Sequence, residues 1–404
     1  MADESKEVEY IEFTRFVMPV GPVHPSLKEP IHFKVFVRRE EILDVDLNLG
    51  HVHRGIEALA ETKNLIQALY LIERVCGICS HSHTTCFVQA VEEIGGIQPS
   101  ERALYLRTLI FELERIHSHL LIIGLMAYQI GFDTLFMHVW TVREKILDLF
   151  EEITGNRIHH AMNMIGGVRW DLTQTMIEKL QKTMDELEKA VRSIYGFFMD
   201  KTVEKRLSGV GFLSFDDARV LCAVGPTARG SGLTFDVRRD DPYAAYGYLK
   251  DSFSTVSKRE GDAYARIEVR ILELFESINL VRTIIDRLPR DSIAPKEAAL
   301  RLIRQIPAGE AISRVEAPRG ELFYFSRTNG RGGLERLKIR TPTLANIASL
   351  RKMLIGYEIA DIPVVVTSVD PCISCTERIL VIDEAKGEVE VIDAQELRRK
   401  KLCS

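Results

Sequence analysis

Two Cys-x-x-Cys pairs, Cys76/Cys79 and Cys372/Cys375, lie near opposite ends of this 404-residue chain. A Cys-x-x-Cys turn points both sulfur atoms at one spot, so two such turns brought together form a four-thiolate cage for metal. One pair alone would be ambiguous between a zinc site, disulfide chemistry and coincidence. Two pairs demand a fold that brings these distant segments of the chain into contact.

The residues that flank the two pairs decide between kinds of metal site. Spacing alone favours a structural zinc clip. Zinc ribbons usually carry Gly, Lys or aromatic residues at their turns, whereas here Arg74 precedes the first pair and Asp370-Pro371 precedes the second. An arginine beside thiolates lowers their pKa and can donate hydrogen bonds to anionic metal ligands. The flanking residues therefore favour a reactive metal centre.

Composition narrows the remaining classes of protein. Seven cysteines, an odd number, argue against a disulfide framework and for a reducing compartment. A net charge of −5 and the lack of a basic run argue against a nucleic-acid partner. The first residues show no signal peptide. The most apolar stretch, Leu120 to Trp140, contains Gln129, Asp133 and His138, so we interpret it as a buried helix rather than a membrane span.

The N-terminal region shows β periodicity. Apolar residues alternate with polar ones from Ile31 to Val37 and again from Leu43 to Leu49, and the charged residues 38–41 between them predict a hairpin turn. From Glu57 to Val75 the pattern becomes helical and delivers the first cysteine pair at a helix end.

Long helices follow. Ser100 is a good N-cap for a helix that carries Leu104 and Ile110 on its apolar face. Apolar spacing suited to bundle packing predicts further helices over Thr134–Ile153, Thr173–Lys205 and Asp262–Leu288. The Gly- and Arg-rich stretch Val224–Gly232 is expected to be a functional loop.

After Pro307 the chain becomes mixed. We expect strands over Glu321–Ser326 and Pro363–Ser368, and a helix that begins at Thr341-Pro342. Residues 379–383 and 388–392 suggest a last hairpin.

These elements predict an α+β fold that is predominantly α, with a central bundle of long helices. We expect a single large domain over 1–404. Its parts are a β-rich region (1–56), a helical bundle (57–306), a mixed α/β region with the second cysteine pair (307–378), and a C-terminal extension (379–404).

The residues that flank the two cysteine pairs resemble those of a known family. Arg-x-Cys-Gly-x-Cys together with Asp-Pro-Cys-x-x-Cys is similar to the large subunit of nickel–iron hydrogenases. The segments that share this resemblance are Gly21–Pro25, His53–Glu57, Glu114–His119, Gly225–Gly232 and Glu316–Glu321. Their local forms resemble the energy-converting, membrane-bound branch and the homologous quinone-site subunit of respiratory complex I. Complex I relatives lack the four cysteines, which this chain retains.

The resemblance implies roles for the cysteines. Cys76 and Cys372 match terminal nickel ligands, and Cys79 and Cys375 match thiolates that bridge nickel and iron. It also implies carbon monoxide and cyanide on the iron, and it allows a magnesium ion as a further cofactor. Soft thiolates suit both nickel and iron.

The resemblance extends to residues around the metals. Arg319 matches the arginine that overhangs the open nickel position, and His83 matches a histidine beside a bridging sulfur. Pro318 and Ser368 match positions that line the diatomic ligands of the iron, and Asp370 is expected to pair with a nearby arginine. In one departure, Ser118 stands where many soluble hydrogenases have an aspartate, a feature shared by the energy-converting branch.

Proton delivery requires a titratable group near a bridging cysteine. Glu29 matches the proposed proton-relay glutamate of that branch; the alternative is a surface charge before a strand. Arg378 matches the position after which a protease removes the C-terminal extension in many relatives.

The resemblance implies the catalytic large subunit of a membrane-bound energy-converting hydrogenase, peripheral on the cytoplasmic face of the membrane. An iron–sulfur small subunit would carry electrons in its clusters from a ferredoxin-type donor. Antiporter-like and quinone-site-like membrane subunits would couple the reaction to ion translocation. Two alternatives remain: a sulfur- or quinone-reducing relative, and a non-catalytic coupling subunit with zinc or nothing in the cage.

Overall fold

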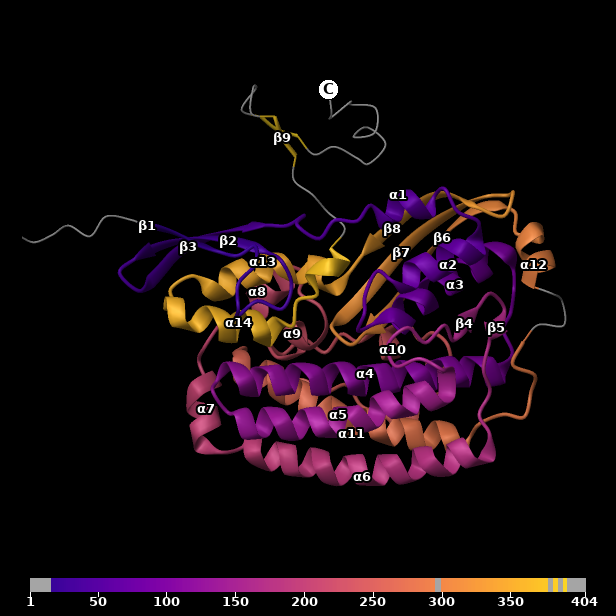
Figure 1. Ribbon diagram of the computed structural model, residues 1–404, viewed down its shortest axis with the longest axis horizontal. Coiled ribbons are helices and arrows are strands. Elements are labelled where there is room, and N and C mark those ends of the chain that lie inside the picture. The colour runs from indigo at the N-terminus through magenta and orange to yellow at the C-terminus, as the bar shows by residue number, and fades with distance from the viewer. Residues whose placement is uncertain (1–15, 295–298, 377–380, 384–387, 391–404) are drawn as a thin grey trace, which may run out of the picture.

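A three-stranded antiparallel sheet begins the part of the chain that the computed structural model describes, residues 16–294, 299–376, 381–383 and 388–390 (Figure 1). Its strands, in spatial order, are β1 (Phe16–Val20), β2 (His32–Arg38) and β3 (Glu41–Asn48). The predicted hairpin between β2 and β3 is confirmed, and Arg39 at its turn has a φ of 58°.

The predicted alternation along β3 holds only in part. Phe36 pairs with Asp44 while Val37 pairs with Ile42, so Leu43 is an extra residue in the ladder. Such a bulge moves the following side chains to the other face of the strand. Ile42 is buried as a result, whereas Leu43 is only half-buried.

The helix predicted from Glu57 to Val75 is two helices, α1 (Ile56–Ala60) and α2 (Leu65–Glu73). Asn64 separates them because its side chain accepts the Gln67 amide while the Gln67 side chain accepts the Asn64 amide, a capping box that starts α2. Helix α3 (Ser80–Gly95) begins directly after Cys79, its N-cap residue.

Four long helices form a layer below the sheets (Figure 1). They are α4 (Glu101–Gln129), α5 (Asp133–Thr154), α6 (Gln174–Phe198) and α11 (Ala263–Asp286). Helix α4 packs on α5 and α11, and α6 packs on the same two helices. Ser100 caps α4 as predicted, accepting the Ala103 amide at 3.1 Å. The predicted Thr173–Lys205 helix is interrupted at Met199-Asp200, and α7 (Lys201–Leu207) follows.

The apolar stretch Leu120–Trp140 is not one helix. Gly131 adopts a left-handed conformation, φ 78°, and separates α4 from α5. Among the described residues, no helix has both the length and the apolar composition needed to cross a membrane.

A second antiparallel sheet lies above the helix layer. It contains β6 (Ala308–Ala317), β7 (Gly320–Asn329) and β8 (Leu334–Arg340), and α3 packs against β6 and β7. The strand predicted at Glu321–Ser326 is thus confirmed within β7. Thr341 caps α13 (Pro342–Leu354), also as predicted.

Two predictions in this half are wrong. Residues 363–368 lie in a helix, α14 (Ile362–Val369), rather than in a strand, and Pro363 occupies its first turn. The expected loop Val224–Gly232 contains the short helix α9 (Gly225–Arg229).

Shorter elements complete the described chain. They are β4 (Asn163–Met164), β5 (Gly167–Val168), α8 (Phe215–Val220), α10 (Val237–Asp240), η1 (Tyr246–Ser252), α12 (Ala299–Gln305), η2 (Ile359–Asp361), η3 (Ile373–Cys375), β9 (Val381–Asp383) and β10 (Glu388–Glu390). Strands β9 and β10 pair as predicted, whereas Arg378 lies outside the described residues. With 54% helix and small antiparallel sheets, the predicted α+β class is confirmed.

Candidate metal centre

The four sulfur atoms of the two cysteine pairs meet in the interior. Cys76 Sγ lies 3.5 Å from Cys372 Sγ, and Cys372 Sγ lies 2.8 Å from Cys375 Sγ. The sulfur atoms of Cys76, Cys79 and Cys375 all lie within 4.8 Å of one another. All four side chains are buried, and none is in a disulfide. The predicted contact between the distant pairs is therefore present.

Local backbone geometry orients the sulfur atoms of each cysteine pair. In the first turn, the amides of Ile78 and Cys79 donate to Cys76 Sγ at 3.3 and 3.2 Å. In the second, Asp370 ends α14 in the left-handed region, φ 59°, which turns the chain into Pro371 and Cys372. The Cys372 amide then donates to Thr343 Oγ1 at 2.9 Å.

The two turns are joined by Arg54, which precedes α1. Its guanidinium donates to the carbonyls of Arg74 and Val75, at 2.8 and 2.7 Å, and to the carbonyl of Ser374, at 2.9 Å. Planar guanidinium groups suit such multiple contacts. One side chain thus fixes the first cysteine turn against the second.

Arg319 lies at the turn between β6 and β7 and faces Asp370. Its Nη2 donates to Asp370 Oδ1 at 3.0 Å, its Nε to the Asp370 carbonyl at 2.8 Å, and its Nη1 to Ser118 Oγ at 3.4 Å. Burial alone would lower the pKa of Arg319, but Asp370 and the cysteines, Cys372 foremost, raise it well above its usual value. The arginine expected beside Asp370 is therefore Arg319, and Ser118 of α4 accepts its remaining N–H contact.

Close backbone packing holds this turn in place. A Cβ on Gly225 would lie 2.3 Å from the Arg319 carbonyl oxygen, and one on Gly320 would lie 2.7 Å from the Gly225 amide nitrogen. Only glycine permits such an approach. The Gly- and Arg-rich segment predicted to be functional thus supports the turn that carries Arg319.

Glu29 reaches the cage from the segment before β2. Its Oε1 lies 3.9 Å from Cys372 Sγ, and its carboxylate accepts the Ser374 amide at 2.9 Å and the Ser374 hydroxyl. Burial and the charge of Cys372 raise the pKa of Glu29, and the bonds from Ser374 oppose that rise. These contacts with the cage contradict the alternative interpretation of Glu29, a surface charge before a strand.

Three other predicted residues are buried near the site. His83 Nδ1 contacts Tyr324 OH at 2.7 Å, its Nε2 has no partner among the described residues, and burial lowers its pKa to about 4. Pro318 precedes Arg319 in the hairpin turn. The Ser368 hydroxyl donates to the Val365 carbonyl at 2.7 Å, so its proton is already engaged. Their roles toward a metal ligand stay predictions.

Arg74 requires a correction. It is the C-cap residue of α2, and its half-exposed side chain runs back along that helix to the Tyr70 carbonyl and to Glu73, at 2.7 and 3.1 Å. The guanidinium expected beside the thiolates is instead that of Arg319.

Sequence reasoning missed three further contributors. Lys28 lies 3.5 Å from Asp370 Oδ1, and burial lowers its pKa to about 8 although Asp370 opposes that shift. Arg270 of α11 donates to the Val369 carbonyl at 3.3 Å. Glu114 of α4 accepts the amides of α3's first turn, those of His81 at 2.7 Å and Ser82 at 3.0 Å. The only signal for Glu114 was its place in the Glu114–His119 segment.

The residues fit an anionic cluster of soft metals. Four thiolates are the ligands that nickel and iron accept, and the positive charge of Arg319 acts on them, while Lys28 and Arg270 act on the neighbouring Asp370. Buried polar atoms near the cage, Asp370 Oδ2 and Arg270 Nε, lack partners among the described residues. No second group of three His, Cys, Asp or Glu ligands occurs in the described part. The magnesium ion stays a prediction, because one or two carboxylates with carbonyls and waters suffice to hold it.

Known proteins share both the sequence and the fold. Residues 129–305 and 303–378 match the 49 kDa subunit of respiratory-chain NADH dehydrogenase, and residues 54–126 match the nickel-dependent hydrogenases. The carbon monoxide-induced hydrogenase of Rhodospirillum rubrum is 42% identical, covering 90% of this chain and 99% of that protein. The alpha subunit of the membrane-bound hydrogenase of Pyrococcus furiosus is 40% identical, covering 92% and 90%. The structure of an archaeal membrane-bound sulfane sulfur reductase matches with a TM-score of 0.86 at 28% identity, covering 91% of this chain and 100% of that one.

The fold and the thiolate site define a large subunit of the nickel–iron hydrogenase type. The chain belongs to the family that unites the large subunits of membrane-bound hydrogenases with the 49 kDa subunit of complex I. The hydrogenase relatives support an oxidoreductase role.

Proposed function

We propose that this chain is the catalytic large subunit of an energy-converting, membrane-bound nickel–iron hydrogenase that interconverts protons and electrons with dihydrogen. The observation that carries the proposal is the convergence of four buried cysteines beneath Arg319. The coverage of the two hydrogenase relatives, at 40 and 42% identity, supports it.

Cys76, Cys79, Cys372 and Cys375 would hold a nickel–iron centre. When bound, that centre supplies the redox chemistry of dihydrogen and carries the carbon monoxide and cyanide ligands of its iron. The chain itself provides a dry environment, because every cysteine of the cage is at most 4% exposed. Arg319 supplies a fixed positive charge over the cage, and Asp370 orients it.

Glu29 would carry the proton. Its carboxylate lies against Cys372 Sγ on one side and the Ser374 hydroxyl on the other, and its raised pKa makes it hold a proton more readily than an ordinary glutamate does. Loss of a positioned acid or base typically slows a reaction by about 10²–10⁴-fold. We therefore expect Glu29→Gln to slow hydrogen turnover to that extent while metal content stays unchanged, and Glu40→Gln, on the exposed β2–β3 turn, to do neither.

Electrons would enter from a ferredoxin-type donor through the clusters of an iron–sulfur small subunit. Membrane subunits of antiporter-like and quinone-site-like type would couple turnover to ion translocation, with this chain on the cytoplasmic face. The membrane-bound relatives support an assembly of this kind. Removal of residues after Arg378 would complete maturation.

The fold match to a sulfane sulfur reductase favours one alternative, reduction of sulfur on the same scaffold. Infrared spectroscopy of the natively purified complex separates the two. Carbon monoxide and cyanide stretching bands, with nickel and iron near one each, are expected for the hydrogenase. Zinc in the cage, or a fully processed complex without those bands, would overturn the proposal in favour of sulfur reduction or a coupling role.

A further inference from the structure

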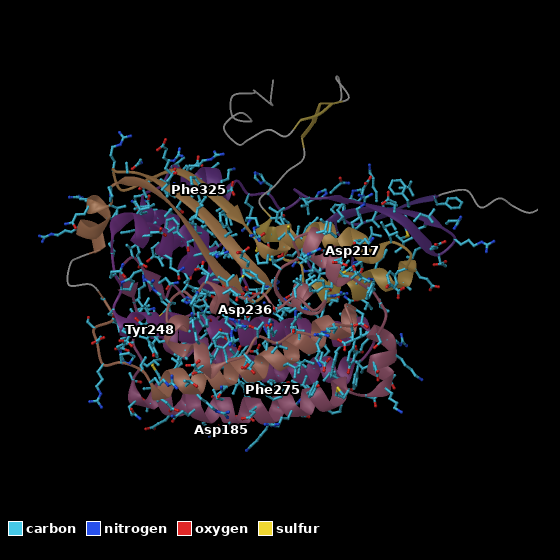
Figure 2. All side chains as sticks on the ribbon, turned by 180° about the vertical axis from the view of Figure 1, so that it is seen from behind. Asp185, Asp217, Asp236, Tyr248, Phe275 and Phe325 are labelled. Atoms are coloured by element: carbon cyan, nitrogen blue, oxygen red, sulfur yellow. The ribbon has the colours of Figure 1, made fainter. Side chains whose placement is uncertain are left out.

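A closed network of eight ionisable side chains fills the space between the helix layer and the second sheet, where Figure 2 labels Asp236. Ion pairs, and for His119 a hydrogen bond with Glu273, connect its members, and each side chain is at most 1% exposed. They are Glu112, Arg115 and His119 of α4, Arg229 of α9, Asp236 and Arg238 at the start of α10, Glu273 of α11, and Glu316 of β6. None of them is a cysteine of the cage.

The charges of this network do not balance. It holds four carboxyl groups but only three guanidinium groups, and burial lowers the pKa of His119 to about 4, which leaves that ring neutral. The sum is therefore one negative charge in excess. A buried charge without a partner is strongly destabilising.

A further buried cation, Arg270, interacts with both the network and the metal site. Arg270 lies one turn before Glu273 on α11, and its N–H groups donate to the carbonyls of Arg266 and Val369, at 2.7 and 3.3 Å. Both Asp370 and Glu273 act on its charge. Arg270 therefore offsets the excess negative charge of the network only in part, because its charge also interacts with Asp370 at the metal site.

Three of the four carboxylates are well compensated. Glu112 lies near two guanidinium groups and accepts two hydroxyls, Asp236 accepts two N–H groups of one guanidinium, and Glu273 binds one guanidinium and His119. These contacts involve Arg115, Arg238, Tyr246 and Ser277 for Glu112, Arg238 for Asp236, and Arg229 for Glu273.

Glu316 has the weakest compensation. Its Oε1 accepts one N–H of Arg229, at 2.7 Å, and the same nitrogen also donates to the Phe235 carbonyl at 3.1 Å. Within the described part of the chain, its Oε2 accepts only the Val237 amide, at 3.2 Å. One bound proton balances the charge of the network. It binds to Glu316 at the lowest cost, because this carboxylate has the fewest stabilising contacts to lose on protonation.

We propose that the network is a proton-storing site whose one exchangeable proton is held by the Glu316 carboxyl. Uptake forms one O–H bond with a proton drawn from solvent, and no electron moves. Burial raises the pKa of Glu316 to about 7; Arg229 and Arg115 oppose this shift and Asp236 adds to it. The remaining polar neighbours are Tyr243, whose hydroxyl accepts the Glu316 amide, and Glu321, its pair across the hairpin.

The site of the stored proton is linked to the thiolate cage by its place in the fold. Glu316 precedes Arg319 by three residues in one hairpin, and Arg115 donates to the Glu316 carbonyl at 2.6 Å. The charge of Arg270 interacts with the carboxylates of both Glu273 and Asp370. Because like charges repel, a more negative cage would favour proton binding in the network. This inference does not depend on which metals fill the cage.

Infrared difference spectroscopy of the purified complex, between mildly acidic and mildly alkaline pH, tests the proposal. A protonated carboxyl absorbs apart from a carboxylate and shifts in heavy water. We expect the carboxyl signal that titrates near pH 7 to contain one component that vanishes in Glu316→Gln and persists in Glu310→Gln. Glu310 is the matched control, because it lies on the same strand but is exposed and pairs with Arg327.

Two outcomes overturn the proposal. One is an unchanged band in a folded Glu316→Gln variant; the other is loss of the band in Glu114→Gln instead, since burial also raises the pKa of Glu114 to about 7. Should Glu316→Gln not assemble, Glu316→Asp takes its place. A shifted frequency or midpoint in that variant supports the assignment, and a spectrum identical to that of the native complex refutes it.

Discussion

Arg54 offers the sharpest test of how the metal cage is held together. Three of its hydrogen bonds run to carbonyls, those of Arg74 and Val75 in the first cysteine turn and that of Ser374 in the second. Arg54→Lys keeps the positive charge but replaces a planar fork with a single ammonium group, which cannot span both turns. The substitution therefore isolates the link between the turns from the effect of charge.

The magnitude follows from the bonds lost. We assume that lysine retains one of the three carbonyl contacts. Each lost bond contributes about 0.5–1.5 kcal/mol net, so two cost about 1–3 kcal/mol. In a binding equilibrium this corresponds to about 5- to 150-fold weaker retention of metal.

The assay is metal content of the purified complex after a timed challenge with a chelator, measured together with thermal unfolding. Arg38→Lys is the matched control, because Arg38 makes one exposed ion pair with Glu41 at 3.0 Å, and such pairs contribute about 0–1 kcal/mol. We expect Arg54→Lys to lose metal faster than both the native protein and the control. Equal retention in all three would refute the idea that Arg54 fixes the two turns against each other.

Three further predictions concern other contacts. Gly225→Ala places a Cβ 2.3 Å from the Arg319 carbonyl at a φ of +64°, so we expect a loss of about 2–5 kcal/mol in unfolding free energy and impaired turnover. Gly196→Ala, with open space around it in α6, should instead stabilise by about 0.5–1 kcal/mol, and similar effects of the two would contradict the packing argument. Iodoacetamide should label exposed Cys222 in the native fold but not Cys86, whose pKa burial raises to about 12; mass spectrometry decides, and early labelling of Cys86 would be inconsistent with this. Because the pKa of Glu114 is raised on folding, from an ordinary value of 4.5 to about 7, its contribution is full below the ordinary value and is lost as pH rises toward 7. Glu114→Gln should therefore flatten the fall of unfolding free energy across that window, and an unchanged slope in denaturant titrations would argue against the shift.

Local signals in the sequence predicted the elements that local interactions determine. The caps at Ser100 and Thr341 are such cases, because an N-cap satisfies amides within its own first turn. The β2–β3 hairpin is another, since alternation defines its buried face. Helix α14 was misassigned because its run of valines has no polar side to reveal a period, and a short buried helix and a buried strand then look alike.

The same distinction between local and long-range interactions applies to the residues of the site. The four cysteines could be predicted because each pair carries its own spacing and flanking residues. Lys28 and Arg54 could not, because each acts on a segment far away in sequence, at Asp370 and Ser374. The role predicted for Arg74 is wrong, because closeness in sequence does not determine which way a side chain points. At the C-terminus of α2, the Arg74 side chain turns back along the helix.

The separation of the two cysteine turns sets an order of events during biosynthesis. Cys76 and Cys372 are 296 positions apart, and the second turn follows the whole helix layer and the second sheet. At a synthesis rate of about 5–20 residues per second, the first pair waits about 15–60 s for its partner. During that interval two thiols are exposed to any thiophilic ion and to oxidants. Metal loading of the finished cage is thus necessarily a late step, and a chain that stalls before Cys375 ends as an incomplete ligand set.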